Sequence, residues 1–342
     1  CHKKGYSHLY PLYNVFAIRY VVLIHAYCKL RIKNPVLLIM KTNFLITGGT
    51  GMVGSEIMRK LTLKGYKVKN LSTKLSTDPK TYLWDPSERK IDLEAFKNIE
   101  TIIHLAGASI TKRWTTKNKK EILDSRIQST RFLFEIIASI PKNKRPKQII
   151  CASAIGIYPS HPDKIYSEHD DSNDDSNDDF LAHVVLKWEK EIFKFIDQNI
   201  RVCCVRIGLV LGKNGGVLST LMPFFKLGIG SPLGNGNQWM PWIHVSDLAR
   251  QFIFLAENEN YQGVFLGVGK ESITNRKFSR ALAYKIKRPY FLPPLPGFLL
   301  YFILGSKAKL ALMSTRCSSN FWQKEGFKYE YPELENALND LL

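Results

Sequence analysis

The chain has 342 residues, of which 45% are hydrophobic, and it carries 49 Lys and Arg against 30 Asp and Glu. This length can bury one large core or two smaller ones, and the hydrophobic fraction excludes a largely disordered chain. The formal net charge of +19 would attract phosphates, but the basic residues are spread along the chain and accompany no RNA-binding aromatic motif. No nucleic-acid partner is therefore expected.

The six cysteines form no Cys-x-x-Cys pair and no cluster with histidine. This spacing predicts neither a metal site nor a disulfide scaffold. We interpret the cysteines as reduced, buried, small hydrophobic residues, which is typical of a cytoplasmic protein.

Residues 1–39 form an unusual N-terminal extension. They carry six basic residues and no acidic one, and the first methionine of the chain is Met40. The apolar run 15–28 is interrupted by Arg19 and His25 and falls short of the ~20 residues that a membrane span needs. The extension is either a targeting or anchoring segment or, as we favour, a fragment boundary or an over-extended reading frame upstream of Met40.

From Met40 onward the sequence pattern alternates between strands and helices. Apolar runs and helical spacing predict strands at 44–47, 67–71, 101–105, 148–152 and 201–207, and helices at 53–63, 121–140 and 181–196. Such alternation, with strands that are apolar almost throughout, predicts an α/β fold of the Rossmann type. We expect a doubly wound parallel sheet with helices on both faces and a smaller C-terminal lobe.

A glycine-rich turn, TGGTGMVG at 47–54, directly follows the first predicted strand and opens a helix. Glycines at this spacing make a tight turn and let the backbone approach a pyrophosphate, whose charge meets the helix N-terminus. A glycine-rich turn without a ligand is the alternative. The pattern predicts a dinucleotide site to which the turn contributes Gly48, Gly51, Met52, Val53 and Gly54.

The end of the second predicted strand indicates which dinucleotide is bound. An acidic residue there would bind the ribose hydroxyls of NAD, but the sequence reads Ser72, Thr73, Lys74, and the first acid is Asp78. A lysine with two neighbouring hydroxyls suits a 2′-phosphate, so we predict NADP(H) as the cofactor. An ordinary solvated lysine is the alternative interpretation of Lys74.

The glycine turn and the HLAG motif at 104–107 resemble the nucleotide-binding signature of the short-chain dehydrogenase/reductase superfamily, in its extended epimerase/dehydratase form. Further motifs narrow the resemblance to the YfcH-like epimerase-family branch, whose C-terminal module has unknown function. These motifs are KRWT at 112–115, DSR at 124–126, CASAIG at 151–156, RIGLVLG at 206–212 and QWMPWIH at 238–244. The resemblance covers about residues 40–342 and implies further cofactor contacts from His104, Leu105, Ala106, Gly107 and Arg126. A salt bridge is the alternative role of Arg126.

The chain departs from this superfamily at the residues that move protons. Working members use a serine together with Tyr-x-x-x-Lys, in which the lysine lowers the tyrosine pKa. The serine is matched by Ser153, whereas the tyrosine and lysine positions fall on Leu181 and Val185. Tyr158 is the candidate replacement, and a packed loop aromatic is the alternative reading of it. His183, on the same predicted helix, should face solvent.

The expected substrate side is rich in aromatic residues. The glycine-rich loop 228–242 carries two tryptophans beside a glutamine and a histidine, which suits a small cyclic or sugar-like substrate. The alternatives are tryptophans that plug the joint between the two lobes, a structural histidine at 244, which we favour, and Asp247 as a helix cap. The predicted substrate contacts are Trp114, Gln238, Trp239, Trp242 and His244.

The sequence thus predicts an NADP(H)-binding, epimerase- or reductase-like protein, or alternatively a non-catalytic NADP(H)-binding sensor or scaffold. We divide it into the extension (1–39), an NADP-binding Rossmann domain with substrate-loop insertions (40–290) and a C-terminal module (291–342). A homodimer is a possible assembly. No stable membrane association is expected, because the apolar helix at 297–305 is too short to span a bilayer. The acidic run 170–179 is interpreted as a solvated loop.

Overall fold

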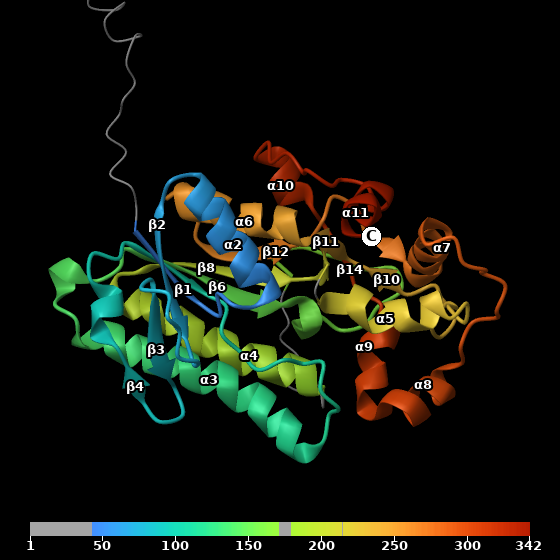
Figure 1. Ribbon diagram of the computed structural model, residues 1–342, viewed down its shortest axis with the longest axis horizontal. Coiled ribbons are helices and arrows are strands. Elements are labelled where there is room, and N and C mark those ends of the chain that lie inside the picture. The colour runs from blue at the N-terminus through green and yellow to red at the C-terminus, as the bar shows by residue number, and fades with distance from the viewer. Residues whose placement is uncertain (1–42, 171–178, 214) are drawn as a thin grey trace, which may run out of the picture. The chain divides into compact units, whose positions relative to one another are not determined.

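The structure is a computed structural model that describes residues 43–170, 179–213 and 215–342 (Figure 1). Residues 42–342 form one compact unit. The expectations for the extension 1–39, and for most of the acidic run 170–179, lie outside the described residues. Among the described residues, no helix combines the length and the apolar character needed to cross a bilayer.

An eight-stranded sheet lies at the centre of this unit, with the strand order β12-β8-β6-β5-β1-β2-β3-β4. All neighbouring pairs are parallel except β3 with β4. The strand order reverses between β1 and β5, and this is the point at which doubly wound sheets bind their ligands. The strands are β1 (Asn43–Thr47), β2 (Lys67–Ser72), β3 (Thr81–Asp85), β4 (Lys90–Ile91), β5 (Thr101–His104), β6 (Gln148–Ala154), β8 (Arg201–Ile207) and β12 (Gly263–Gly267).

Helices cover both faces of the sheet. Figure 1 shows α2 (Met52–Leu63) and α6 (Val245–Glu257) on one face, with α3 (Thr116–Ser139) and α4 (Phe180–Phe193) on the other. The helices of each pair pack against each other. The predicted Rossmann-type, doubly wound α/β fold is confirmed.

Shorter elements extend from the C-terminal edge of the sheet. The remaining helices are α5 (Gly216–Lys226), α7 (Asn275–Lys285), α8 (Gly297–Leu304), α9 (Ala308–Leu312), α10 (Asn320–Lys324) and α11 (Leu334–Leu341). The remaining strands are β7 (Ile165–Tyr166), β9 (Leu209–Gly212), β10 (Trp239–Met240), β11 (Trp242–His244), β13 (Ile273–Thr274) and β14 (Arg316–Cys317), which pair two by two outside the main sheet.

The predicted elements are present, with small differences at their ends. The helix predicted at 121–140 begins earlier, at Thr116, because the Thr115 hydroxyl accepts a hydrogen bond from the Asn118 N–H and caps it. The helix predicted at 181–196 ends at Phe193 and continues as a 3₁₀ turn. The strands β3, β4 and β12 were not predicted, since their half-exposed or short apolar runs lack a clear period.

The cysteines among the described residues are buried and unpaired, as the sequence indicates. They are Cys151, Cys203, Cys204 and Cys317. Burial raises the pKa of each thiol above its ordinary value. These side chains therefore pack as small hydrophobic residues and stay protonated at neutral pH.

Asp247 ties the C-terminal segment to α6. Its carboxylate is fully buried and accepts hydrogen bonds from the backbone N–H groups of Glu330 at 2.7 Å and Tyr331 at 2.9 Å. The expected helix-cap role is wrong, because α6 begins at Val245 and His244 Nδ1 accepts the capping hydrogen bond. Asp247 is structural in a different way. Its carboxylate satisfies the backbone N–H groups of a segment that lies more than 80 positions further along the chain.

Replacing Asp247 by Ala should lower the free energy of unfolding by about 2–4 kcal/mol, because two backbone N–H groups lose their acceptor in a buried place. Urea unfolding followed by circular dichroism measures this change. The control is Glu259→Ala, at an exposed acid, which should stay within about 0.5 kcal/mol of the parent chain. A loss below 1 kcal/mol for Asp247→Ala would contradict the role assigned to this carboxylate.

Candidate functional site

The glycine turn lies at the C-terminal end of β1, between β2 and β5. Gly48 has φ +74°, and a Cβ there would lie 3.1 Å from the Leu105 carbonyl carbon and 3.2 Å from the Ala106 nitrogen. A Cβ on Gly54 would lie 2.3 Å from the Gly48 carbonyl oxygen. The turn is therefore packed tightly against the end of β5, and neither position tolerates a side chain.

The N-terminus of α2 is left open toward solvent. Gly51 stands at the cap position, where it provides no side-chain acceptor, and the first turn of the helix contains no acidic residue. A Cβ on the exposed Gly51 would meet only the Gly48 carbonyl oxygen, at 3.3 Å. Free N–H groups at an uncapped helix start are suited to an anion such as a pyrophosphate.

Met52 and Val53 begin this helix in different surroundings. Val53 packs against the main hydrophobic core, whereas the Met52 side chain contacts the loop after β9. At the two ends of that loop, a Cβ on Gly212, the last residue of β9, would lie 2.5 Å from the Met52 sulfur, and one on Gly216, the first residue of α5, would lie 3.4 Å from its terminal methyl carbon. The approach of this second glycine-rich loop to the first was not predicted, because the two lie about 160 positions apart in sequence.

Asn70 is a buried residue of β2 that the sequence analysis missed. Its side-chain oxygen accepts a hydrogen bond from the Gly49 N–H at 3.2 Å, and the residue is almost fully buried. A Cβ on Gly49 would lie 2.4 Å from that oxygen. Asn70 thus fixes the glycine turn from the side opposite β5. The available signal was its place in β2 (KVKNLS), two positions after Val68 and therefore on the face that the strand buries.

Thr47, the last residue of β1, joins the ends of β1 and β5. Its hydroxyl oxygen accepts hydrogen bonds from the N–H groups of Leu105 at 3.1 Å and Ala106 at 3.2 Å, and lies 2.8 Å from His104 Nδ1. With both acceptor positions used, the hydroxyl must donate its own proton to His104 Nδ1. His104 consequently carries its proton on Nε2.

The second ring nitrogen of His104 connects to the helices below the sheet. Nε2 lies 3.0 Å from the Thr130 hydroxyl, which also accepts from the Trp188 indole N–H at 3.1 Å and donates to the Arg126 carbonyl at 2.7 Å. Burial lowers the pKa of His104 to about 4. The imidazole is therefore neutral and fully engaged inside the protein, so its side chain is not available to a cofactor, in contrast to the role that the resemblance implies.

Arg126 lies beside Gly107 without a salt-bridge partner. One guanidinium nitrogen donates to the carbonyls of Ala108 at 3.1 Å and Ile122 at 3.0 Å, and the group lies over the Trp188 ring. Among the described residues no carboxylate lies within 4.0 Å of it, so the alternative of a salt bridge is not realised there. Burial lowers its pKa to about 10. A cation held in this way can serve an anionic ligand.

The residues at the end of β2 are accessible. Ser72 is half-buried, whereas Thr73 and Lys74 are exposed. The Ser72 hydroxyl oxygen accepts a hydrogen bond from the Lys74 backbone N–H at 3.1 Å. No carboxylate in the described part of the chain lies within 4.0 Å of the Lys74 ammonium.

A buried polar cluster surrounds Ser153. The Ser153 hydroxyl donates to Glu189 at 2.6 Å, and Glu189 accepts two hydrogen bonds of 2.9 Å from Arg206, which form a bidentate ion pair. Arg206 also donates to the Tyr158 hydroxyl at 2.8 Å. The structure therefore brings the two predicted catalytic residues, Ser153 and Tyr158, into one network. Arg206 was predicted only as the first residue of the RIGLVLG motif, and Glu189 was not singled out from the sequence.

Tyr158 is held as a hydrogen-bond donor. Its hydroxyl donates to the Ser167 carbonyl at 2.9 Å, and its ring stacks on Tyr166. Burial raises the pKa of this phenol well above its ordinary value, against the opposing effect of the Arg206 charge. The surroundings favour the packed loop aromatic over a proton-transfer group.

The predicted substrate residues lie in internal contacts with the C-terminal part. The Gln238 side chain donates to the carbonyls of Leu233 and Ala311, and the Trp239 indole donates to the Pro162 carbonyl. Trp242 is fully buried, and its indole N–H has no partner among the described residues. This arrangement favours the alternative of tryptophans that plug the joint between the sheet and the C-terminal elements.

His244 and Trp114 are buried as well. The His244 ring packs on Tyr331 with centroids 3.8 Å apart, its Nε2 lies 3.3 Å from Asp340, and burial lowers its pKa. Trp114 packs edge-on against Phe180, between α3, α4 and α9. Both surroundings are those of structural residues.

The matched families agree with this architecture. Residues 44–267 match the NAD-dependent epimerase/dehydratase family. The chain belongs to this family. Residues 295–341 match a domain of unknown function, DUF1731. The resemblance inferred from the sequence motifs is therefore confirmed.

Individual relatives in the epimerase/dehydratase family cover most of the chain. An epimerase family protein of Staphylococcus aureus is 34% identical over 301 residues, which cover 87% of this chain and 98% of the relative. The structure is similar to a human epimerase family protein solved with NADPH, with 29% identity, a TM-score of 0.77, and 88% and 99% of the two chains covered. It is also similar to a nucleoside-diphosphate sugar epimerase from Corynebacterium glutamicum, with 25% identity, a TM-score of 0.70, and 87% and 57% coverage.

The positions at which the epimerase/dehydratase resemblance places tyrosine and lysine are apolar and buried. Leu181 packs in the cluster around Trp114, and its Cβ would lie 3.3 Å from a Cβ on Gly156. Val185 packs in the cluster around Tyr158. His183, on the same helix, is exposed, as expected. The first turns of α4 thus present no group near Ser153 that could move a proton.

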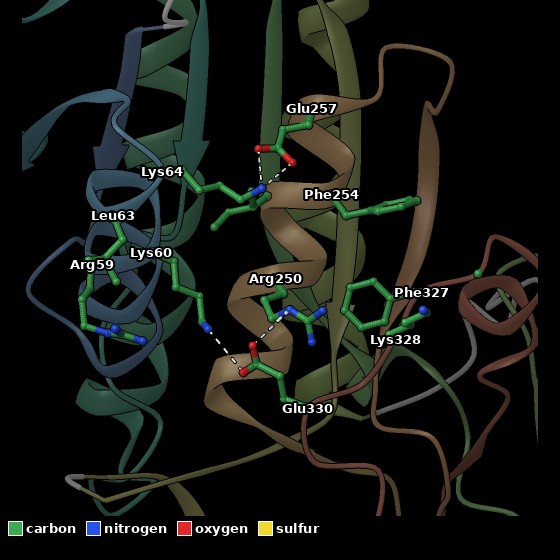
Figure 2. A pocket seen from close by; sticks show the side chains of 12 residues that line it. Arg59, Lys60, Leu63, Lys64, Arg250, Phe254, Glu257, Phe327, Lys328 and Glu330 are labelled. Carbon is green, nitrogen blue, oxygen red and sulfur yellow. Dashed lines mark hydrogen bonds and ion pairs between the residues drawn. The ribbon is translucent and has the colours of Figure 1, made fainter. Parts of the chain in front are cut away.

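A hollow of about 560 Å³ lies away from this cleft, between the C-terminal half of α2 and α6 (Figure 2). Four of its cations are paired within the protein: Lys64 with Glu257 at 2.6 Å, Arg59 with Glu56 at 2.7 Å, and Lys60 and Arg250 with Glu330 at 3.4 and 3.5 Å. It lies at the opposite end of α2 from the glycine turn. We assign it no part in the cofactor site.

The buried His104 should make stability depend on pH. The unfolded chain binds a proton at this residue below about pH 6.5, whereas the folded chain resists protonation down to about pH 4. Stability should therefore fall as pH falls through this window, with a contribution of up to about 1.4 kcal/mol per pH unit from His104. Urea unfolding at several pH values measures the slope.

The variant His104→Asn should show a smaller slope than the parent chain over the same window, although it is less stable at pH 7. His183→Asn, at an exposed histidine, controls for the loss of an imidazole in general. Equal slopes in the parent chain and His104→Asn would show that His104 is not held neutral.

Proposed function

We propose that this epimerase/dehydratase-family chain binds NADP(H) in the cleft at the ends of β1 and β5. The observation that carries the proposal is the uncapped, acid-free start of α2 behind a glycine turn that leaves no room for side chains at Gly48, Gly49 and Gly54. The preference for NADP(H) over NAD(H) rests on Lys74, which is exposed at the end of β2, where no acidic residue stands. NADPH in the solved human relative supports the same choice.

The residues of the cleft fit this cofactor in distinct roles. The backbone N–H groups of Met52 and Val53 at the start of α2 would hold the pyrophosphate, whereas the Gly51 N–H closes the turn by donating to the Gly48 carbonyl at 3.0 Å. Ser72, Thr73 and Lys74 would bind the 2′-phosphate, and Arg126 would add positive charge on the β5 side. When bound, the cofactor supplies a hydride that it can donate or accept.

Any proton transfer in this chain must differ from the Tyr-Lys scheme. Ser153 donates a hydrogen bond to Glu189, and Tyr158 donates one to the Ser167 carbonyl, so both hydroxyls keep their protons and neither is an available base. We therefore assign Ser153 and Tyr158 structural roles in the buried cluster. A small sugar-like or cyclic substrate stays a prediction; the name of the Corynebacterium relative, a sugar epimerase, is in line with it.

The second candidate is an NADP(H)-binding protein without turnover, which acts as a redox-state sensor or scaffold. The specific observation in its favour is the apolar, buried surroundings of Leu181 and Val185 next to the closed Ser153 cluster. Both candidates share the cofactor site and differ only in whether the bound cofactor reacts.

Replacing Lys74 by Glu should weaken NADPH binding by about tenfold or more, because a cation that faces the 2′-phosphate becomes an anion. NADH binding should change by less than about threefold. Calorimetric titration measures both affinities. Lys67→Glu is the matched control, since it lies at the other end of the same strand, is exposed, and should alter neither affinity. Equal binding of NADH and NADPH by the parent chain would refute the proposed preference.

Turnover separates the two candidates. NADPH consumption is followed by the absorbance of the reduced nicotinamide, with a panel of carbonyl compounds and nucleotide sugars. If a substrate is found, Tyr158→Phe should keep the shape of the pH profile and lower kcat by less than about tenfold, because this phenol is not the base. A loss of about a thousandfold in a stably folded variant would restore Tyr158 as a catalytic residue. Tight NADPH binding with no consumption across the panel favours the sensor.

A further inference from the structure

The helix α8 presents an apolar surface to solvent. Every residue from Phe298 to Leu304 is hydrophobic, yet only Leu300 is buried. Phe298 is 71% exposed and Phe302 is 85% exposed. A helix that is apolar on all sides is normally buried, so the exposed residues of α8 indicate a surface that binds another apolar surface. We define the α8 surface by its exposed residues, which are Phe298, Leu299, Tyr301, Phe302 and Ile303.

Further apolar side chains lie in the neighbouring segments. Phe291, in the chain that leads into α8, is 75% exposed. That chain runs beside the loop after α5, since the Leu295 N–H donates to the Pro232 carbonyl at 2.7 Å and a Cβ on Gly228 would lie 3.9 Å from Pro289. The same loop exposes Leu227 and Ile229. Figure 1 shows α5, α8 and α9 in one region of the molecule.

The charged residues in the sequence around α8 are all basic. Residues 272–324 contain no Asp or Glu, while this stretch supplies ten of the cations that give the chain its net charge of +19. These cations are Arg276, Lys277, Arg280, Lys285, Lys287, Arg288, Lys307, Lys309, Arg316 and Lys324. The cations nearest to α8 in the sequence are Arg288 before it and Lys307 after it, so the apolar helix is bracketed by positive charge alone.

Some of these cations are engaged inside the protein, and others are available. Lys309 pairs with Asp179 at 3.0 Å, and Lys307 donates to the Thr111 carbonyl. Lys287 and Arg288, which precede the exposed Phe291, are exposed, and no carboxylate lies within 4.0 Å of them in the described ranges. Near the end of α8, a Cβ on Gly305 would lie 4.0 Å from Nε of the exposed Arg113.

We propose that the α8 surface binds reversibly to the surface of an anionic phospholipid bilayer. Phenylalanine, tyrosine and leucine side chains insert at the boundary between headgroups and acyl chains, and lysine and arginine beside them attract the anionic headgroups. With eight residues, α8 is about 12 Å long, so it lies in the interface and does not cross the bilayer. The sequence predicted no stable membrane association because the helix at 297–305 is too short to span a bilayer. That argument does not apply to a helix that lies on the bilayer surface.

Charge distinguishes the bilayer from other partners. A symmetric contact between two copies would place the same acid-free segment against itself, and like charges would repel. A nucleic acid would bind the cations through its phosphates but would leave the phenylalanines of α8 exposed to water. An anionic bilayer satisfies both the apolar and the basic side chains.

The test is co-sedimentation of the full chain with vesicles of phosphatidylcholine, with and without phosphatidylserine, at low and physiological salt. Binding is expected with phosphatidylserine and should weaken as salt rises. The double variant Phe298→Ser/Phe302→Ser should lower the partition coefficient at least about tenfold. The double variant Lys287→Glu/Arg288→Glu should lower it about fivefold or more for each residue on anionic vesicles.

The matched control is Leu75→Ser, at a residue that is 86% exposed beyond the end of β2. All replaced side chains are exposed, so the variants should fold, and an unchanged melting temperature together with unchanged NADPH binding checks this. No binding to anionic vesicles, equal binding to both vesicle types, or equal loss in Leu75→Ser would overturn the proposal. So would concentration-dependent dimerisation that Phe298→Ser/Phe302→Ser abolishes, because the surface would then bind a second copy.

Discussion

The ion pair between Glu189 and Arg206 determines how the chain is built around Ser153. Both groups are almost fully buried, so each charge depends on the other and on the surrounding hydroxyls. The pair links α4 to β8: Glu189 accepts a hydrogen bond from Ser153 on β6, and Arg206 donates one to Tyr158 in the following loop. Removing either partner would leave a charge without compensation inside the sheet, which is far more costly than losing a surface pair.

This arrangement has a chemical consequence for the site. The hydroxyl proton of Ser153 is held in a hydrogen bond to a carboxylate, and that of Tyr158 is held in a hydrogen bond to a carbonyl. Neither hydroxyl can therefore accept a proton from a substrate. The cluster therefore gives rigidity to the region where related enzymes would place a mobile proton. The cofactor cleft, in contrast, is made of backbone groups and keeps its uncapped helix start open.

The sequence predicted features that depend on local pattern. The glycine turn, the strand before it and the helix after it lie within about twenty residues, so spacing alone identified them. The supporting contacts of that turn come from Asn70 and from the ends of β1 and β5, which are close only after the sheet has formed. The same is true of Glu189 and Arg206, seventeen positions apart on different elements.

The predicted substrate residues show a second limit of pattern reading. Aromatic residues in a glycine-rich loop are equally typical of a binding surface and of an interface between lobes. Here Gln238 bonds to the carbonyl of Ala311, and His244 stacks on Tyr331, so partners far along the chain decide between the two. The exposure of α8 was hidden for the same reason: an apolar run of eight residues predicts a helix but does not say what covers it.

The contact between Gly49 and Asn70 also has an evolutionary meaning. A side chain at position 49 would collide with the Asn70 amide, and any shorter residue at position 70 would leave the Gly49 N–H without its acceptor. A Cβ on Gly49 would also lie 2.5 Å from the Met58 sulfur, so positions 49, 58 and 70 should vary together or not at all among descendants of this sequence. A joint substitution at all three would mark a lineage in which the cofactor turn has been rebuilt.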